Sequence, residues 1–259
     1  SFSQLLEIYN NMKINKIGIS EKADISTQSS IGDDVYIGAF TSICKNAKIG
    51  KNVKIHPNCY IGENVVIEEN TIIFPNVSIY HNCKVGANNI IHSGAIIGSD
   101  GFGFAPNSKK NYDKIRQIGN VEIGDNVEIG ANTTIDRSTM GSTKIGKGVK
   151  LDNLIQIAHN VEIGENTVIA AQSGIAGSSK IGKNCMIGGQ VAISGHLSIT
   201  DNVKIAGQSG IASSIKKKGA IVQGPMAFDI KEFQRSYIIF RKLPQIYKTL
   251  NLIQKQLDA

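Results

Sequence analysis

An aliphatic residue returns at every sixth position along most of this chain. One run extends from Ile19 to Ile97 without a failure, a short run covers Ile123 to Ile135, and a third extends from Ile145 to Ile211. A period of six fits neither an amphipathic helix nor a simple alternating strand. Together the runs contain 29 hexads, and they predict a solenoid in which short parallel strands alternate with tight corners.

The residues between the aliphatic positions are typical of sharp corners. Glycine commonly follows the aliphatic residue and asparagine often comes two residues later, as in Gly50 to Asn52 and Gly62 to Asn64. Both residue types tolerate a left-handed backbone conformation, so we expect both to adopt it at the corners. The aliphatic side chains then point inward and stack on their copies in neighbouring coils.

The hexad pattern resembles that of the hexapeptide-repeat acyltransferases. The resemblance implies an all-β solenoid, a left-handed parallel β-helix with three hexads in each triangular coil, although left-handed crossovers are rare elsewhere. On that basis 29 hexads correspond to about ten coils. At about 4.8 Å per coil the prism is about 45 Å long.

Two interruptions and two ends depart from the repeat. Residues 98–117 contain glycine, proline and aromatic residues and predict an external loop, and a shorter interruption lies around Asp136 to Ser142. We therefore divide the chain into a linker or short helix (1–15), a β-helix (16–222) and a C-terminal α-helical extension (223–259). The extension reads as two helices, Ala227–Phe240 and Leu243–Leu257, separated near Pro244. Such helices are expected to cap the open edge of the last coil.

The positive charge is concentrated at the C-terminal end. The net charge is +7, and the segment from Ser213 to Ala259 holds nine basic and three acidic residues. This distribution predicts either a solvated helix face or a surface for an acidic partner.

The four cysteines form no CxxC pair, so we expect small buried residues rather than a disulfide or a metal site. That use of cysteine suits the reducing cytoplasm. No apolar run reaches the length of about 18 residues that a transmembrane helix needs, and no signal peptide is evident.

One histidine stands where chemistry is possible. His159 lies two residues after Ile157, at a corner, and Gly177 and Gly195 lie 18 and 36 residues further on, with His196 beside the second glycine. In a coil of 18 residues these positions stack along one edge over about 10 Å. They supply a base, a nearby backbone N–H and a second imidazole, as acyl transfer requires. The alternative is a pair of surface histidines.

A metal site is the other interpretation of the histidines. His56 and His92 are also 36 residues apart, and a trimeric β-helix carbonic anhydrase holds zinc with three histidines. Such a site needs three protein ligands, but Ile97 and Asp201 stand where a third would be, and His81 lies at another phase of the repeat. We therefore expect no metal, and surface or subunit contacts for these three histidines.

A more specific resemblance rests on motifs outside the plain hexads. They are Ser99–Ala105, which contains Asp-Gly-Phe-Gly, Ile118–Gly119, Glu128–Arg137, Leu151–Asn160, Ile175–Ser178, and Gly188–Val191 with Gly195–His196. Over nearly its whole length the chain resembles the UDP-3-O-acylglucosamine N-acyltransferases.

This resemblance implies a cytoplasmic homotrimer of lipid A biosynthesis, with active sites in grooves between neighbouring β-helices. Its members transfer a 3-hydroxyacyl chain from acyl carrier protein to the 2-amino group of UDP-3-O-acylglucosamine. The carrier's phosphopantetheine arm delivers the acyl group, and no cofactor is permanently bound. The family also carries an N-terminal domain that helps to hold uridine, which this sequence, with its repeat starting near residue 16, is read as lacking.

The resemblance also implies roles for individual residues. His159 matches the general base, His196 the second active-site histidine and Gly177 the backbone donor to the oxyanion. Further residues are expected to bind the sugar lipid or to line its groove: Asp152, Asn153, Gln156, Phe102, Phe104 and Gly210. Phe102 and Phe104 read equally well as a structural anchor, and Gly210 as a corner residue. Basic residues are candidates to meet the acidic carrier protein: Lys216, Lys217, Lys218, Arg235, Arg241 and Lys242.

Two alternatives remain open. The related O-acyltransferase acting on UDP-N-acetylglucosamine shares the hexads, and the Asp100–Gly103 insertion speaks against it. A non-catalytic hexapeptide-repeat binding module is the other, and the presence of His159, Gly177 and His196 together argues against it. Nucleic acid is not an expected partner.

Overall fold

The computed structural model describes residues 16–224 and 229–258. The chain forms two compact units, one that ends at Gly224 and one that begins at Pro225. The predicted linker or short helix at 1–15 lies outside the described residues.

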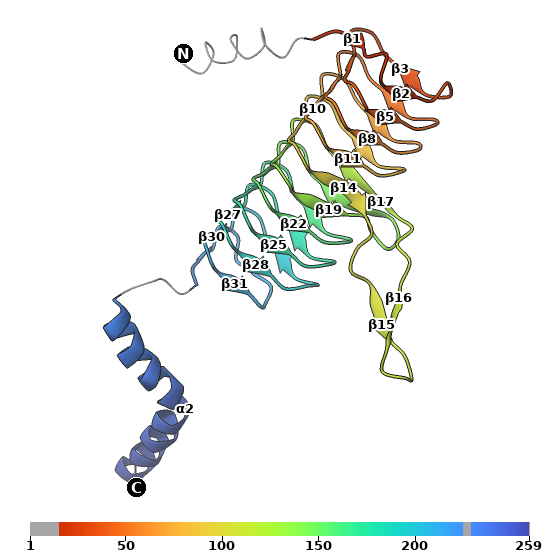
Figure 1. Cartoon of the computed structure of the whole chain (residues 1–259). Coiled ribbons are helices and arrows are strands. Elements are labelled where there is room, and N and C mark those ends of the chain that lie inside the picture. Colours follow the sequence, from red (N-terminus) through yellow and green to blue (C-terminus); the bar gives the residue numbers. More distant parts are fainter. Residues whose placement is uncertain (1–15, 225–228, 259) are drawn as a thin grey trace, which may run out of the picture. The chain divides into compact units, whose positions relative to one another are not determined.

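The first unit is a parallel β-helix with three faces (Figure 1). Within residues 16–224 the three sheets contain eleven, ten and nine strands, which confirms the expectation of about ten coils. Sheet A consists of β1 (Gly18–Ile19), β4 (Tyr36–Ile37), β7 (Lys54–Ile55), β10 (Ile72–Ile73), β13 (Ile90–Ile91), β18 (Glu128–Ile129), β21 (Lys150–Leu151), β24 (Val168–Ile169), β27 (Met186–Ile187), β30 (Lys204–Ile205) and β32 (Ile221–Val222).

The other two faces follow the same rule. Sheet B consists of β2 (Asp24–Ile25), β5 (Ser42–Ile43), β8 (Tyr60–Ile61), β11 (Ser78–Ile79), β14 (Ile96–Ser99), β19 (Thr134–Asp136), β22 (Gln156–Ile157), β25 (Gly174–Ile175), β28 (Ala192–Ile193) and β31 (Gly210–Ile211). Sheet C consists of β3 (Ser30–Ile31), β6 (Lys48–Ile49), β9 (Val66–Ile67), β12 (Lys84–Val85), β17 (Asn120–Ile123), β20 (Ser142–Ile145), β23 (Glu162–Ile163), β26 (Lys180–Ile181) and β29 (Ser198–Ile199).

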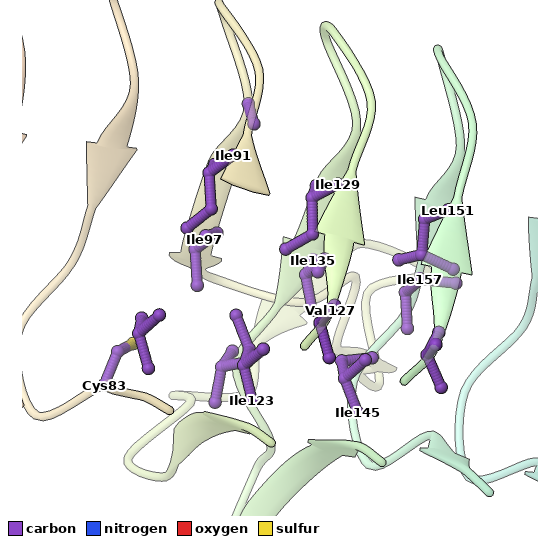
Figure 2. Packing of buried hydrophobic residues seen from close by; sticks show 14 of the residues in the cluster. Cys83, Ile91, Ile97, Ile123, Val127, Ile129, Ile135, Ile145, Leu151 and Ile157 are labelled. Carbon is purple, nitrogen blue, oxygen red and sulfur yellow. The ribbon is translucent and has the colours of Figure 1, made fainter. Parts of the chain in front are cut away.

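The hexad aliphatics form continuous rows inside the prism. Ile91 pairs with Ile129 and Ile129 with Leu151, although 38 and then 22 residues separate them. Figure 2 shows this row on neighbouring strands. The interruptions therefore leave the core register unchanged, and their extra residues leave the prism. Three of the four cysteines, Cys59, Cys83 and Cys185, are buried and unpaired, as expected.

Asparagine and glycine have different roles at the corners. Asn52 and Asn64 have φ values of 58° and 57°, which confirms the left-handed conformation expected for asparagine. The same expectation is wrong for Gly50, which is absent from the positive-φ glycines. A methyl carbon at Gly50 would lie 2.7 Å from the backbone nitrogen of Glu69 in the next coil. Glycine is used there because the coils approach closely.

The external loop at 98–117 contains a hairpin of its own. Strands β15 (Phe104–Pro106) and β16 (Tyr112–Lys114) pair antiparallel and project from the prism (Figure 1). The hairpin leaves from the corner where the chain passes from sheet B to sheet C, which we call the B–C corner.

The second unit contains one helix, α2 (Ile230–Leu257), with Asp229 as its N-cap. The prediction of two helices separated near Pro244 is wrong, because Pro244 lies inside this helix. A proline removes one backbone hydrogen bond, and the helix-forming residues on either side continue the helix past it. None of the helices that the structure describes is long and apolar enough to cross a membrane. How α2 relates to the last coil stays a prediction.

Adjacent residues of a hexad should contribute very differently to stability, because one points into the prism and the other points outward. Ile67 is 1% exposed inside the prism, whereas the preceding Val66 faces outward and is only partly buried. Ile67→Ala should lower the free energy of unfolding by about 2–5 kcal/mol, because it leaves a cavity in the stack. Chemical denaturation measures the change, and Val66→Ala is the control, with an expected loss well below that of Ile67→Ala.

Candidate functional site

His159 lies at the B–C corner between β22 and β23, and glycines contact its ring on two sides. A methyl carbon at Gly177, in the next coil, would lie 2.7 Å from both Cε1 and Nε2 of His159. A methyl carbon at Gly101, in the external loop, would lie 2.7 Å from Cβ and 3.0 Å from Cδ2 of the same side chain. The half-buried imidazole therefore sits between a coil and a loop, and neither position has room for a larger residue without movement.

The predicted stack along this corner is present. Ser178 N donates to His159 O at 2.9 Å, and His196 N donates to Gly177 O at 3.0 Å. A methyl carbon at Gly195 would lie 3.1 Å from Gly177 O. The structure thus brings His159, Gly177 and His196 onto one edge, with the exposed His196 one coil beyond Gly177.

The backbone N–H of Gly177 is available for a ligand. Within residues 16–224 and 229–258, no hydrogen bond is recorded from this N–H, while the Gly177 carbonyl is engaged by His196. The N–H in the corresponding slot is also unpaired at other described corners, such as Glu165 and Gly195, so the feature that distinguishes Gly177 is the imidazole beside it. An unpaired N–H beside the imidazole is the kind of donor that stabilises an oxyanion.

Asn160 fixes the protonation pattern of His159. Its Oδ1 accepts from Thr139 N at 3.0 Å, and its Nδ2 donates to Met140 O at 3.1 Å. These two bonds orient the amide, so the atom that lies 3.1 Å from His159 Nδ1 is an acceptor oxygen. Nδ1 must then carry the proton in the neutral ring. The lone pair is left on Nε2, which is the nitrogen that faces Gly177.

A buried carboxyl group lies beneath the histidine. Asp136 Oδ1 accepts from Ser99 Oγ at 3.1 Å, and its Oδ2 accepts from Gln156 Nε2 at 2.8 Å. Burial raises the pKa of Asp136, while the hydrogen bonds from Ser99 and Gln156 and the nearby charge of His159 oppose that rise. Gln156 also accepts from Thr134 Oγ1. Gln156 is therefore held on the same side of the prism as His159.

Asp152 and Asn153 lie elsewhere in the single chain. They occupy the preceding corner, between sheets A and B, where Asn153 Oδ1 accepts from Ala131 N at 2.7 Å. There they line a groove of about 850 Å³ along sheet A, whose walls also include Val168, Met186 and Ile221. One chain by itself does not bring Asp152 and Asn153 to His159.

Among the described residues, neither Phe102 nor Phe104 of the loop forms a ring pair with His159. Phe102 and Phe104 pack edge to face at 5.0 Å between ring centroids, and Phe102 is 84% exposed. Gly101 of the loop lies against the imidazole, although the sequence pattern predicts no role for this residue.

The remaining predicted binding residues are exposed. A methyl carbon at Gly210 meets no atom within 4 Å, and this residue continues the outward row of sheet B above Gln156, Gly174 and Ala192. Lys216, Lys217 and Lys218 are exposed at the last coil, while Arg235, Arg241 and Lys242 are exposed on α2 in the other unit.

The other histidines are not arranged as metal ligands. Phe74 stacks between His56 and His92, at 5.2 Å and 5.1 Å between ring centroids. Among the described residues, no group of three or more His, Cys, Asp or Glu side chains converges as a metal site would.

Comparisons with known proteins identify the repeat and the family. The family described as "Bacterial transferase hexapeptide (six repeats)" matches residues 28–63, 64–99 and 142–177, and "Hexapeptide repeat of succinyl-transferase" matches residues 120–153. A UDP-3-O-acylglucosamine N-acyltransferase of Christiangramia forsetii is 54% identical over 258 residues, which is 100% of this chain and 75% of the relative. The same enzyme of Phocaeicola vulgatus is 58% identical over 258 residues, 74% of its length.

The chain belongs to the UDP-3-O-acylglucosamine N-acyltransferase family.

Solved structures with a similar fold identify the fold of this chain. The Arabidopsis UDP-N-acetylglucosamine acyltransferase has a TM-score of 0.70 at 21% identity, over 85% of this chain and 77% of that one. The Bacteroides fragilis UDP-N-acetylglucosamine acyltransferase has a TM-score of 0.60 at 27% identity, over 76% and 68%. The shared fold is the left-handed parallel β-helix, whose handedness the resemblance to hexapeptide-repeat acyltransferases implied.

The hexad repeat did not predict three residues of the candidate site. Asp136 and Arg137 lie in the second interruption, and Asn160 lies in a slot that elsewhere serves only as a corner. A signal was nevertheless present, since Glu128–Arg137 and Leu151–Asn160 contain these residues and carried the resemblance.

The tautomer of His159 provides a test that needs no turnover. Asn160→Ala should remove the acceptor at Nδ1 and leave both neutral tautomers populated, whereas the wild type should hold the proton on Nδ1. Nitrogen NMR shifts of the imidazole distinguish the two cases. Asn166→Ala is the matched control, because Asn166 has a similar φ of 56° at a neighbouring corner. An unchanged His159 spectrum in Asn160→Ala would remove Asn160 from this role.

Proposed function

We propose that this chain transfers a 3-hydroxyacyl group from acyl carrier protein to the 2-amino group of UDP-3-O-acylglucosamine, in lipid A biosynthesis. The observation that carries the proposal is the position of the His159 ring against Gly177, whose N–H makes no hydrogen bond among the described residues. Relatives that are 54% and 58% identical over the whole chain are named for this activity.

The geometry supports direct transfer. The lone pair on His159 Nε2 accepts a proton from the sugar amine as that nitrogen attacks the thioester carbonyl. The carbonyl oxygen becomes an oxyanion and accepts a hydrogen bond from Gly177 N–H. When the tetrahedral intermediate collapses, the carbon–sulfur bond breaks and the imidazolium returns the proton to the phosphopantetheine thiolate. The products are an amide and a free thiol, and no acyl-enzyme, metal or bound cofactor takes part in this route. His196, on the same edge, is placed to contact the substrates.

We further propose a homotrimer with the site in a groove between prisms. Sheet C has a charged outer face, with Lys84 bonded to Glu122 at 2.9 Å. Sheet A instead exposes Val168, Met186 and Ile221 beside its groove. The same groove also contains Glu128, Lys150 and Lys204, and exposed apolar residues gathered beside it favour contact with another subunit. Contact between prisms is the arrangement in which Asp152 and Asn153 of one subunit join His159 of another.

The donor and the compartment follow from the same proposal. An acidic carrier protein suits the basic last coil and the basic residues of α2, and an enzyme that uses acyl carrier protein works in the cytoplasm. The sugar lipid would lie along sheet B, where Gly210 leaves an open outward row for an acyl chain, and Phe102 and Phe104 of the external loop are candidates to contact it. Donors of different chain length in the assay below test that row.

The deciding experiment is a turnover assay with 3-hydroxyacyl carrier protein and UDP-3-O-acylglucosamine, in which mass spectrometry locates the new bond. An amide at the 2-position supports the proposal. An ester formed on UDP-N-acetylglucosamine would instead indicate the related O-acyltransferase, and no product with either acceptor would favour a binding module.

His159→Ala should lower kcat by about 10² or more, the usual contribution of a general base. The fold should be retained, because the side chain sits at a half-buried corner and not in the isoleucine stack. Steady-state kinetics and thermal melting measure both effects. Near-normal turnover by a folded His159→Ala protein would exclude this histidine as the base.

Charge reversal at Lys216, Lys217 and Lys218 should raise the KM for acyl carrier protein and weaken its dependence on salt. Exposed charges at the rim of an interface act mainly on association. Kinetics at several ionic strengths measure the change, and reversal of Lys45 and Lys51, exposed in early coils, is the control. A change confined to the KM of the UDP-sugar would assign the lysines to the nucleotide instead.

A further inference from the structure

We infer that Arg137 is a positioning residue, which holds the external loop against the imidazole of His159 without touching the substrates. The inference rests on the proposed function for its kinetic consequence. Its structural part stands on contacts within this chain.

Arg137 occupies the same slot of the B–C corner as His159, one coil earlier. Both residues come two positions after the inward isoleucine of sheet B, Ile135 and Ile157, which pair with each other. Gly177 fills this slot one coil later. The imidazole therefore has Gly177 on one side and the coil of Arg137 on the other.

The Arg137 side chain is buried and is bound to the base of the loop. The residue is 2% exposed. Its Nε donates to Gly98 O at 2.7 Å, and its backbone N donates to Ser99 O at 2.8 Å. Asp100 Oδ1 lies 3.9 Å from Nε. One residue thus engages three consecutive loop residues, Gly98, Ser99 and Asp100.

The far end of the guanidinium is anchored two coils before Arg137, on the coil that precedes the loop base. Nη1 of Arg137 lies 2.6 Å from Nε2 of His81. Burial, and next the charge of Arg137, hold the pKa of His81 below its usual value, against smaller opposing contributions from Glu63 and Asp100. His81 is therefore neutral near pH 7, and its Nε2 accepts from the guanidinium.

The neighbouring Asp136 also holds the base of the loop, since it accepts from Ser99 Oγ at 3.1 Å. The next loop residue after this anchored stretch is Gly101, which contacts Cβ and the ring of His159. Because Gly101 and Gly177 confine the imidazole between them, a shift of the loop base would release the ring. Displacements of about 1 Å in a catalytic group can cost about 10²-fold in rate.

A role in stability alone fits the burial of Arg137 less well. Among the described residues, Nη2 of Arg137 is buried without a hydrogen-bond partner. A buried guanidinium with an unsatisfied donor is costly. An apolar side chain would fill the same space without that cost, so the arginine is better explained by the loop that it holds.

The test compares Arg137→Met, Arg137→Lys and Arg116→Met. Arg116 is an exposed arginine of the same loop and serves as the control. Arg137→Met should lower kcat by about ten- to a hundredfold and leave both KM values within about twofold. Arg137→Lys, which keeps a charge and a donor, should recover part of the loss, and Arg116→Met should resemble the wild type.

A second measurement does not depend on turnover. In Arg137→Met, amide hydrogen exchange at residues 98–103 should accelerate and the Nδ1 proton of His159 should exchange faster with water, at an unchanged melting temperature. Wild-type rates at both places would overturn the inference, as would a loss of kcat that melting accounts for in full. If the wild type transfers no acyl group, the proposed function fails, and the exchange data alone decide whether Arg137 positions the loop.

Discussion

The structure depends on backbone hydrogen bonds that join each coil to the next at one fixed register. Ile55 pairs with Ile73 and Ile73 with Ile91, and every corner must turn with its neighbours for the bonds to form. The left-handed asparagines make that turn, and small residues such as Gly50 let the backbones approach. As a consequence, a given position of the coil recurs about 4.8 Å further along the prism. Residues from successive coils can therefore form a column of functional groups along one edge.

The candidate site is one such column at the place where the repeat is interrupted. His81, Arg137, His159 and Gly177 all occupy the same slot of the B–C corner. Both interruptions leave the prism from this corner, and the core rows continue past them without a change of register. The external loop therefore lies against a rigid edge. Many folds position functional residues in this way, with variable loops on a rigid scaffold. The isoleucine stack supplies the rigidity, and the interruptions supply Gly101, Asp136 and Arg137.

The parts that the sequence predicts are those governed by the period. The inward rows, the number of coils and the stack of His159, Gly177 and His196 all follow from counting in steps of six and eighteen. The repeat could not predict the positions of Asp136 and Arg137, because both residues lie where the six-residue period is interrupted. Asn160 was missed for a different reason. It occupies a slot that asparagine fills at ordinary corners, and its side-chain oxygen finds its partner, Thr139 N, in the second interruption. The two-helix prediction failed because Pro244 was taken as the end of a helix. The site role of Asp152 stays a prediction, because within one chain this residue lies at a different corner from His159.

The most direct test of this account adds one carbon at the centre of the column. Gly177→Ala should fold and melt like the wild type but lose most of its acyl-transfer turnover, since the new methyl carbon would meet Cε1 and Nε2 of His159 at 2.7 Å. Gly189→Ala is the matched control, because Gly189 fills the same slot at the corner between sheets A and B, where the nearest atom to a methyl carbon is Ala171 O at 3.2 Å. We expect a loss of kcat in Gly177→Ala and near-normal kcat in Gly189→Ala. Wild-type kcat in a folded Gly177→Ala protein would contradict the role of Gly177 beside His159.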